Sequence, residues 1–174
     1  LTFNQIKTEV DRYASIFYEA GFRKDDKIVL QLPNIVELAI LYIALSKMGI
    51  IVSPIPVQYG KYEITKIIAD IKPKGYIGIA SFNSKNFTEG IRSAFTDEHI
   101  LFSVGDADGF IDIEKEGFGE NSLLDSDAYI QSITNSANDI LTICWTSGTT
   151  GTPKGVPRSH NLWVTMAKAA YHLA

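Results

Sequence analysis

The stretch KIVLQLPNIVELAILYIALSKMGIIVSPIP, residues 27–56, decides the fold class of this chain of 174 residues. It contains a short apolar run (27–32), a longer apolar segment that follows Pro33, and a second short apolar run (50–56). Short apolar runs are typical of buried strands, and a proline suits the first turn of a helix. The stretch therefore predicts a strand, a helix and a strand in succession.

The same alternation continues towards the C-terminus. Residues 61–72 carry apolar side chains at helical spacing, Pro73 and Gly75 interrupt that pattern, and a third strand is predicted over 75–80. Strands that alternate with helices are the signature of a parallel sheet covered by helices. The chain is therefore expected to have an α/β fold built on a largely parallel sheet with flanking helices.

Further elements are predicted on both sides of this core. Residues 2–20 repeat apolar side chains every three or four positions, and Gly21 is a plausible helix stop. Ser159 is a good N-cap for a helix over 160–174. The remaining expectations are helices over 87–95 and 122–133, strands over 99–104 and 139–147, and a surface hairpin or loop over 105–122.

Composition and charge limit the function classes. Hydrophobic residues make up 45% of the chain and charged residues 21%, which are ordinary values for a globular domain. The net charge is −4, so attraction to nucleic acid is not expected. No apolar run reaches the roughly 20 residues of a membrane span and no signal peptide is recognisable, so we expect a cytoplasmic protein.

Two patterns that suggest metal binding are weak. Cys144 is the single cysteine, so it has no partner for a disulfide or a zinc site, and we expect it to be buried and inert. Asp106, Asp108 and Gly109 match three positions of a calcium-binding loop, but the last ligand position of that loop falls on Lys115 instead of a glutamate. An ordinary turn is expected there.

The stretch TSGTTGTPKG, residues 146–155, follows the last predicted strand and is rich in Gly, Ser and Thr. Backbone N–H groups of such a loop can surround phosphate oxygens, Lys154 adds a positive charge, and Pro153 stiffens the segment. The spacing differs from the P-loop of nucleotide triphosphatases, in which the lysine lies between Gly and Ser or Thr. The residues alone leave open a phosphate-binding loop and a solvent loop without a ligand.

The full string Trp145–Val156 resembles the phosphate-loop signature of the adenylate-forming superfamily at every position: an aromatic residue, then Thr-Ser-Gly-Ser/Thr-Thr-Gly-x-Pro-Lys-Gly-Val. This superfamily includes acyl- and aryl-CoA synthetases, firefly luciferase and the adenylation domains of nonribosomal peptide synthetases. Residues 1–6 and 45–60 resemble earlier family segments more weakly. The resemblance implies that residues 1–174 are an incomplete, Rossmann-like N-terminal portion of the AMP-binding domain, within the large N-terminal domain of such an enzyme.

The resemblance also implies a reaction. ATP and a small-molecule carboxylic acid would give an acyl-adenylate and pyrophosphate, and the acyl group would then pass to the thiol of CoA or of a carrier protein. Lys154 would act in catalysis and would bind the phosphates of ATP together with Thr146, Ser147, Gly148, Thr149, Thr150 and Gly151. Thr146 would also contact Mg²⁺. His160 falls near the acid pocket of related ligases, although a solvated residue in a first helical turn is an equally good interpretation.

Other readings stay open at this stage. The loop could belong to a different phosphate-handling enzyme, such as a kinase, or to a non-catalytic module that binds a nucleotide or a protein. The chain also lacks the family's later segments, so we expect it to be inactive alone. The acid is not specified, but residues 158–160 look more like those of CoA ligases than those of peptide synthetases.

Overall fold

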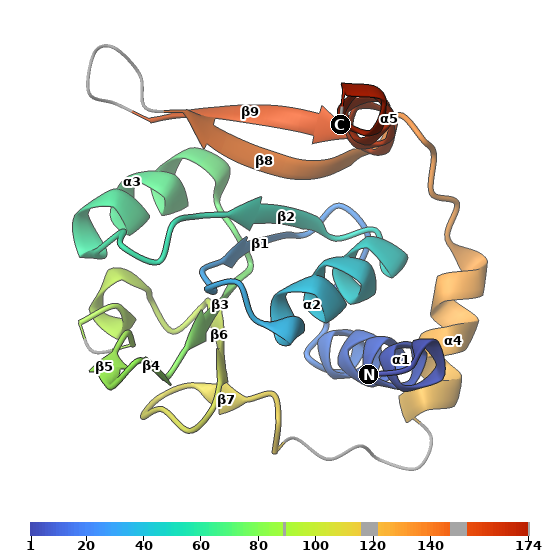
Figure 1. Cartoon of the computed structure of the whole chain (residues 1–174). Coiled ribbons are helices and arrows are strands. Elements are labelled where there is room, and N and C mark those ends of the chain that lie inside the picture. Colours follow the sequence, from blue (N-terminus) through green and yellow to red (C-terminus); the bar gives the residue numbers. More distant parts are fainter. Residues whose placement is uncertain (89, 116–121, 147–152, 174) are drawn as a thin grey trace.

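The computed structural model describes residues 1–88, 90–115, 122–146 and 153–173. In these residues a seven-stranded sheet has the strand order β7-β6-β3-β1-β2-β8-β9, and helices lie on both of its faces (Figure 1). The strands are β1 (Lys27–Leu30), β2 (Ile51–Pro54), β3 (Gly75–Ile79), β6 (Ile100–Val104), β7 (Ile111–Asp112), β8 (Ile140–Thr146) and β9 (Lys154–Ser159).

The helices are α1 (Phe3–Glu19), α2 (Val36–Lys47), α3 (Lys61–Ile71), α4 (Ser122–Ser132) and α5 (His160–Leu173), with a 3₁₀ turn at Arg92–Ala94. A small separate hairpin pairs β4 (Ser81–Phe82) with β5 (Lys85–Asn86). None of the helices in the described ranges combines the length and the apolar character needed to cross a membrane.

Strand β1 lies at the centre of the sheet. It pairs in parallel with β2, where Ile28 is opposite Val52, and in parallel with β3, where Ile28 is opposite Gly75. The pairings of β3 with β6, β6 with β7 and β2 with β8 are also parallel, whereas β9 runs antiparallel to β8. The predicted α/β fold with a largely parallel sheet is therefore confirmed.

The burial of β1 explains why helices cover both faces. Ile28 and Leu30 belong to a hydrophobic cluster with α1 and α2, whereas Val29, between them, belongs to a second cluster with α3. Successive side chains of a strand point to opposite faces. Because all three side chains are at most 1% exposed, both faces of this strand have to be covered by other elements.

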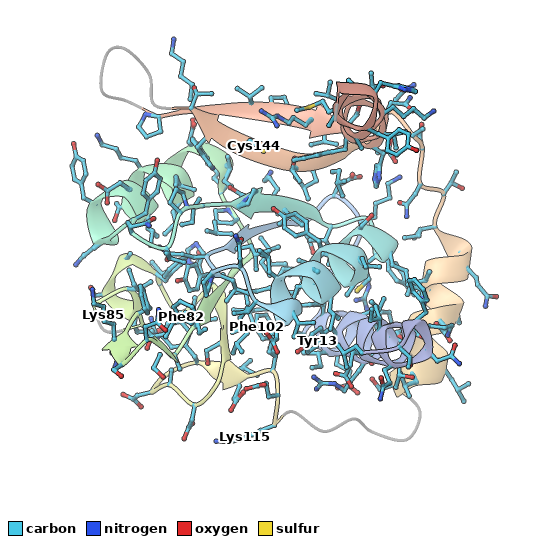
Figure 2. All side chains as sticks on the ribbon, viewed as in Figure 1. Tyr13, Phe82, Lys85, Phe102, Lys115 and Cys144 are labelled. Atoms are coloured by element: carbon cyan, nitrogen blue, oxygen red, sulfur yellow. The ribbon has the colours of Figure 1, made fainter. Side chains whose placement is uncertain are left out.

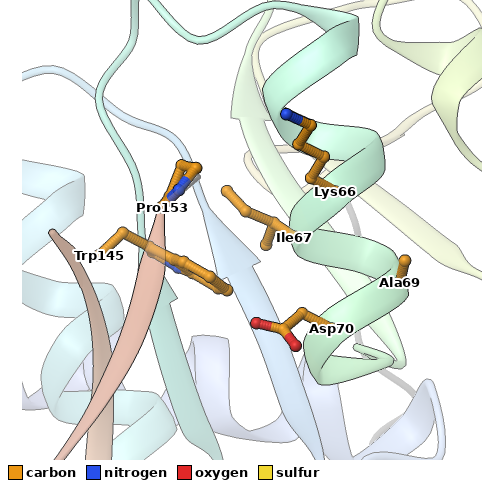
Figure 3. Close-up of a pocket in the computed structure, with 6 residues that line it drawn as sticks. All are labelled: Lys66, Ile67, Ala69, Asp70, Trp145 and Pro153. Carbon is orange, nitrogen blue, oxygen red and sulfur yellow. The ribbon is translucent and has the colours of Figure 1, made fainter. Parts of the chain in front are cut away.

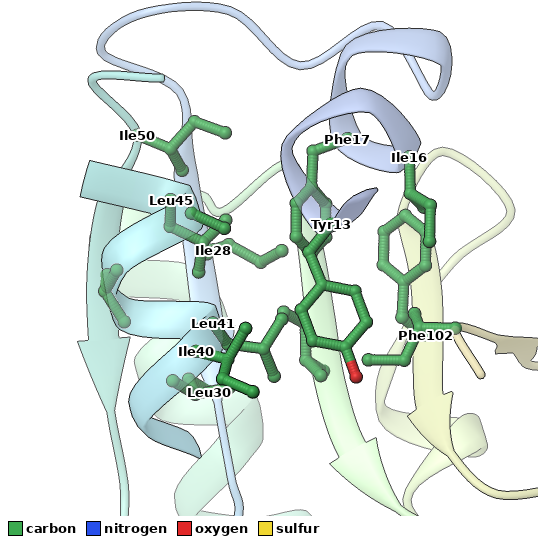
Figure 4. Close-up of a cluster of buried hydrophobic side chains, with 14 of the residues drawn as sticks. Tyr13, Ile16, Phe17, Ile28, Leu30, Ile40, Leu41, Leu45, Ile50 and Phe102 are labelled. Atoms are coloured by element: carbon green, nitrogen blue, oxygen red, sulfur yellow. The ribbon is translucent and has the colours of Figure 1, made fainter. Parts of the chain in front are cut away.

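Three aromatic rings hold α1 on the sheet. The Phe17 ring of α1 lies edge-on to the ring of Phe22, with a centroid distance of 5.9 Å. It also lies edge-on to the ring of Phe102, at 5.2 Å (Figure 4). All three side chains are fully buried. Such edge-to-face contacts add to the free energy gained from burying the rings. Figure 2 shows Phe102 in the interior, whereas Lys85 and Lys115 lie at the margin of the molecule.

The start of α2 differs from the prediction. Pro33 was expected in the first helical turn, but α2 begins at Val36 and its N-cap is Ile35, which has an extended backbone. The backbone N–H of Ile35 donates to the Pro33 carbonyl at 2.8 Å. The chain uses residues 31–35 to turn from the end of β1 onto the face of the sheet, so the proline lies in that turn.

Two other predicted segments are also different. The expected helix over 87–95 is reduced to the 3₁₀ turn. The expected surface hairpin or loop over 105–122 contains β7, which pairs in parallel with β6 and leads into the buried Ile113, and its residues 116–121 lie outside the described residues. In the same segment Lys115 Nζ lies 3.4 Å from Asp106 and 3.5 Å from Asp112. A lysine therefore pairs with carboxylates where a calcium loop would need a glutamate.

The aromatic cluster generates a stability prediction. Phe17→Ala should lower the free energy of unfolding by about 3–5 kcal/mol, because it removes a buried ring and leaves a cavity between α1 and the sheet. Phe3→Ala is the matched control, since Phe3 is on the same helix but 91% exposed. Urea unfolding of both variants measures the difference, and equal losses would show that the ring contacts of Phe17 do not hold α1.

Candidate functional site

The predicted phosphate loop connects β8 to β9 at one edge of the sheet (Figure 1). The antiparallel register places Thr146 opposite Lys154 and Trp145 opposite Gly155. Five of the predicted phosphate-binding residues lie outside the described residues: Ser147, Gly148, Thr149, Thr150 and Gly151. The described part of the site therefore consists of the two strand ends that carry the loop.

One face of these strand ends carries the polar residues of the signature. Directly opposite residues of an antiparallel pair project from the same face of the sheet, so Thr146 and Lys154 lie side by side. Both residues are exposed, and Oγ1 of Thr146 lies 3.5 Å from the Lys154 carbonyl oxygen. The fold thus brings these two residues together at the base of the loop.

The other face of the strand ends packs towards α3. Trp145 and Gly155 share this face, and a cavity of about 360 Å³ separates it from the helix (Figure 3). A Cβ atom on Gly155 would lie 3.3 Å from the Trp145 ring, so the glycine leaves room for the indole. The residues that line the cavity are Trp145, Pro153, Lys66, Ile67, Ala69 and Asp70.

Strand β9 was not predicted from the sequence. Pro157 removes a backbone donor and Gly155 weakens strand propensity, so the segment 154–159 carries no strand pattern. In the described residues β9 is the last strand of the sheet order, and a proline is tolerated on such an edge strand. The missed signal was the hairpin arrangement itself, a strand followed by a Gly-rich loop.

His160 lies at the far end of β9 from Lys154. Six strand residues at about 3.3 Å each separate the two by roughly 20 Å, so the fold does not bring His160 next to Thr146. His160 is the first residue of α5, and Ser159 Oγ accepts from the N–H of Leu162 at 3.3 Å, which confirms the predicted N-cap. A contact of His160 with the acid stays a prediction.

Two indole groups that sequence reasoning missed hold β8 in place. Trp145 Nε1 donates to Ser53 Oγ at 2.8 Å, and Trp163 Nε1 donates to Thr142 Oγ1 at 2.9 Å. Ser53 and Thr142 are fully buried. A buried hydroxyl inside an apolar strand needs a hydrogen-bond partner. The positions of Ser53 and Thr142 in apolar runs are therefore the sequence signal that could have indicated these two bonds. Cys144, expected to be buried, is only half-buried on the same strand.

The segment before β8 is held by Lys24, which precedes β1 in the chain. Its Nζ donates to Asp139 Oδ2 at 2.7 Å and to the Thr134 carbonyl at 2.5 Å. Asp139 also accepts from the N–H of Ser136 at 2.9 Å, and its carbonyl accepts from the N–H of His160 at 3.3 Å. The Lys24 hydrogen bond lowers the pKa of Asp139 below its usual value of 3.8. This network fixes where β8 starts.

One side chain at the strand ends has a donor atom suited to a magnesium ion. In the described ranges no group of three or more His, Cys, Asp or Glu side chains gathers to form a complete protein cage for a metal. Mg²⁺ at nucleotide sites is held largely by phosphate oxygens and water, with one or two protein ligands. The exposed hydroxyl of Thr146 can supply one such oxygen.

Known proteins resemble this chain along nearly its whole length. A family model described as AMP-binding enzyme matches residues 1–173. The acyl-CoA ligase YtcI of Bacillus subtilis is 25% identical over 164 residues, covering 91% of this chain and 28% of its own length. The long-chain-fatty-acid–CoA ligase FadD13 of Mycobacterium tuberculosis is 27% identical over 160 residues, covering 92% and 30%. The chain thus spans less than a third of these relatives.

A solved structure shares the fold. The luciferase-like enzyme of the mealworm Zophobas morio superimposes with a TM-score of 0.78 at 18% identity, over 98% of this chain and 39% of that one. At this identity the likeness concerns the fold alone. It shows that the seven-stranded arrangement is that of a known enzyme architecture.

The Lys24–Asp139 pair generates a prediction on pH dependence. Because the pKa of Asp139 is lowered in the folded state, its stabilising effect is present above pH 3.8 and is lost as the pH falls through the folded-state pKa. Asp139→Asn should therefore lower stability at pH 7 and flatten the loss of stability below pH 4. Urea unfolding from pH 7 to acid pH measures this. Lys24→Met should flatten the curve in the same way, and a slope equal to that of the wild type in both variants would contradict the assignment.

Proposed function

This chain belongs to the AMP-binding enzyme family, and from that premise we propose that it is part of an ATP-dependent acid:thiol ligase of the acyl- or aryl-CoA synthetase type. Residues 1–174 form the N-terminal portion of the AMP-binding domain and are inactive without the rest of the enzyme. The similarity to YtcI and FadD13, both named as CoA ligases, supports this reaction class.

The proposed first step joins a carboxylic acid to AMP. A carboxylate oxygen attacks the α-phosphorus of ATP, the bond from that phosphorus to the bridging oxygen breaks, and pyrophosphate leaves with the negative charge. A group that stabilises this charge accelerates the step when it is already in place before reaction. Lys154 is proposed for this role because its ammonium group is exposed beside the loop.

The observation that carries the proposal is the pairing of Thr146 with Lys154 across the strand ends. Lys154 would face the β- and γ-phosphates, and residues 147–151 would donate backbone N–H groups to them. Thr146 would supply a hydroxyl ligand to Mg²⁺. The bound ion would neutralise phosphate charge, and the protein residues would hold the polyphosphate in one orientation.

The proposed second step passes the acyl group from AMP to a thiol. CoA is the proposed acceptor because the relatives YtcI and FadD13 are CoA ligases, and the thiol of a carrier protein is the alternative. His160 is proposed as a contact of the acid on the resemblance of residues 158–160 to those of CoA ligases, and it lies at the far end of β9 from Lys154.

Pyrophosphate–ATP exchange by the full-length enzyme tests the first step. The enzyme is incubated with ATP, labelled pyrophosphate and one acid at a time from a panel of acyl, aryl and amino acids. The proposal requires label to enter ATP only when a suitable acid is present. Exchange that is independent of every acid would contradict it.

The same experiment separates the rival functions. A kinase with a convergent loop would transfer the γ-phosphate to an acceptor without exchange. A non-catalytic module would bind ATP and would give neither exchange nor transfer. The downstream coding sequence supplies a second criterion, since several hundred further residues would favour the ligase.

Lys154→Ala tests the central residue. We expect kcat/KM for ATP to fall about 10²-fold, because the variant loses a charge that acts on the leaving pyrophosphate. Lys85→Ala is the matched control, since Lys85 is an exposed lysine on the β4–β5 hairpin. Equal kinetics of the two variants in the exchange assay would remove Lys154 from the proposed site.

A further inference from the structure

The last residue before Thr146 makes a hydrogen bond that reaches back into the sheet. Trp145 Nε1 donates to Ser53 Oγ at 2.8 Å, and Ser53 belongs to β2 and is fully buried. A buried hydroxyl that loses its partner is costly, so the geometry of this contact is strongly preferred. Trp145 lies in β8 immediately beside the proposed phosphate-binding residues.

This bond fastens a part of β8 that its backbone register with β2 does not reach. The described register between the two strands pairs Val52 with Thr142, and β8 then continues to Thr146. Over that continuation the described backbone partner is β9, whose register runs to Lys154. The indole of Trp145 therefore ties the loop end of the hairpin to the rigid centre of the sheet.

The ring of Trp145 adds packing to the hydrogen bond. It is half-buried against the cluster that contains Ile67 of α3, on the cavity side of the hairpin (Figure 3). Gly155 opposite leaves room for the ring, since a Cβ there would approach it to 3.3 Å. The end of β8 is thus held on one face by an aromatic side chain and a directed hydrogen bond.

The contact of Trp145 on one face of the β8–β9 strand ends also fixes the residues on the opposite face. Successive side chains alternate, so an indole directed towards α3 directs Thr146 to the opposite face, and the register places Lys154 beside Thr146. A tilt of the hairpin about its base would move both groups together. Their position relative to the sheet therefore depends on the Trp145 contact.

We infer that Trp145 is a positioning residue. Its hydrogen bond to Ser53 fixes the end of β8 and so sets where Thr146 and Lys154 meet the phosphates of ATP. This inference rests on the proposed function of the loop. Trp145 itself has no assigned contact with substrate, because its indole faces α3.

The test is a double-mutant cycle in the full-length enzyme. Trp145→Phe keeps an aromatic ring but removes the N–H donor, and Ser53→Ala removes the acceptor. Each should raise the KM and the Kd for ATP about three- to tenfold, the range that one hydrogen bond supports, and should leave the KM for the acid unchanged. The double variant should be no worse than either single variant, because both remove the same bond.

Trp163→Phe is the matched control for a purely structural effect. It removes an equivalent indole bond, to the buried Thr142 at the other end of the same strand. We expect a comparable drop in Tm and an unchanged KM for ATP. If Trp163→Phe raises the KM for ATP as much as Trp145→Phe does, the effect is general destabilisation of β8 and the inference is overturned.

Direct binding separates failure of the inference from failure of the proposed function. The Kd for ATP is measured by calorimetry for the wild type and each variant, independently of exchange. Weaker ATP binding by Trp145→Phe and Ser53→Ala supports positioning even if the wild type gives no acid-dependent exchange, which would contradict the ligase function alone. Wild-type Kd values in both variants, or no binding of ATP by the wild type, would overturn the inference.

Discussion

Burial of the central strand on both of its faces is the constraint on which this structure depends. Ile28 and Leu30 point to one face of β1 and Val29 points to the other, and all three are shielded from water. A parallel strand in this position needs helices above and below it. The crossings that provide these helices give the order β3-β1-β2, to which β6 and β7 add on the β3 side and β8 and β9 on the β2 side.

The candidate site lies where this rigid core ends. β8 joins the sheet beside β2, and β9 turns back along β8 to form an edge. Side chains alternate between the two faces of these strands. One face packs against α3, and the other carries Thr146 and Lys154. A loop that binds a polyphosphate needs such a base, because charge stabilisation is effective only when the charged groups are held before the reaction.

Features set by residues close together in the chain were predicted correctly, whereas features set by contacts with distant strands were not. The end of α1 was predicted correctly from Gly21. This residue takes a positive φ of 82°, a local requirement that glycine meets without strain. The start of α2 was wrong because the turn from β1 is set by the sheet, and Pro33 became part of that turn. β9 was missed because its pairing with β8 overrides the weak strand propensity of a segment that contains Gly155 and Pro157.

The sequence by itself determined the α/β class, through the alternation of apolar runs, and the family, through the string from Trp145 to Val156. Both are patterns of residues close together in the chain, so they can be recognised in the sequence alone. Only the tertiary structure decided that Trp145 bonds to Ser53, 92 residues away, and that Lys24 fastens Asp139, 115 residues away. Contacts at such separations depend on how the strands are ordered in the sheet. A hydroxyl inside an apolar strand, such as Ser53, indicates that some partner is needed, but the sequence does not say which residue supplies it.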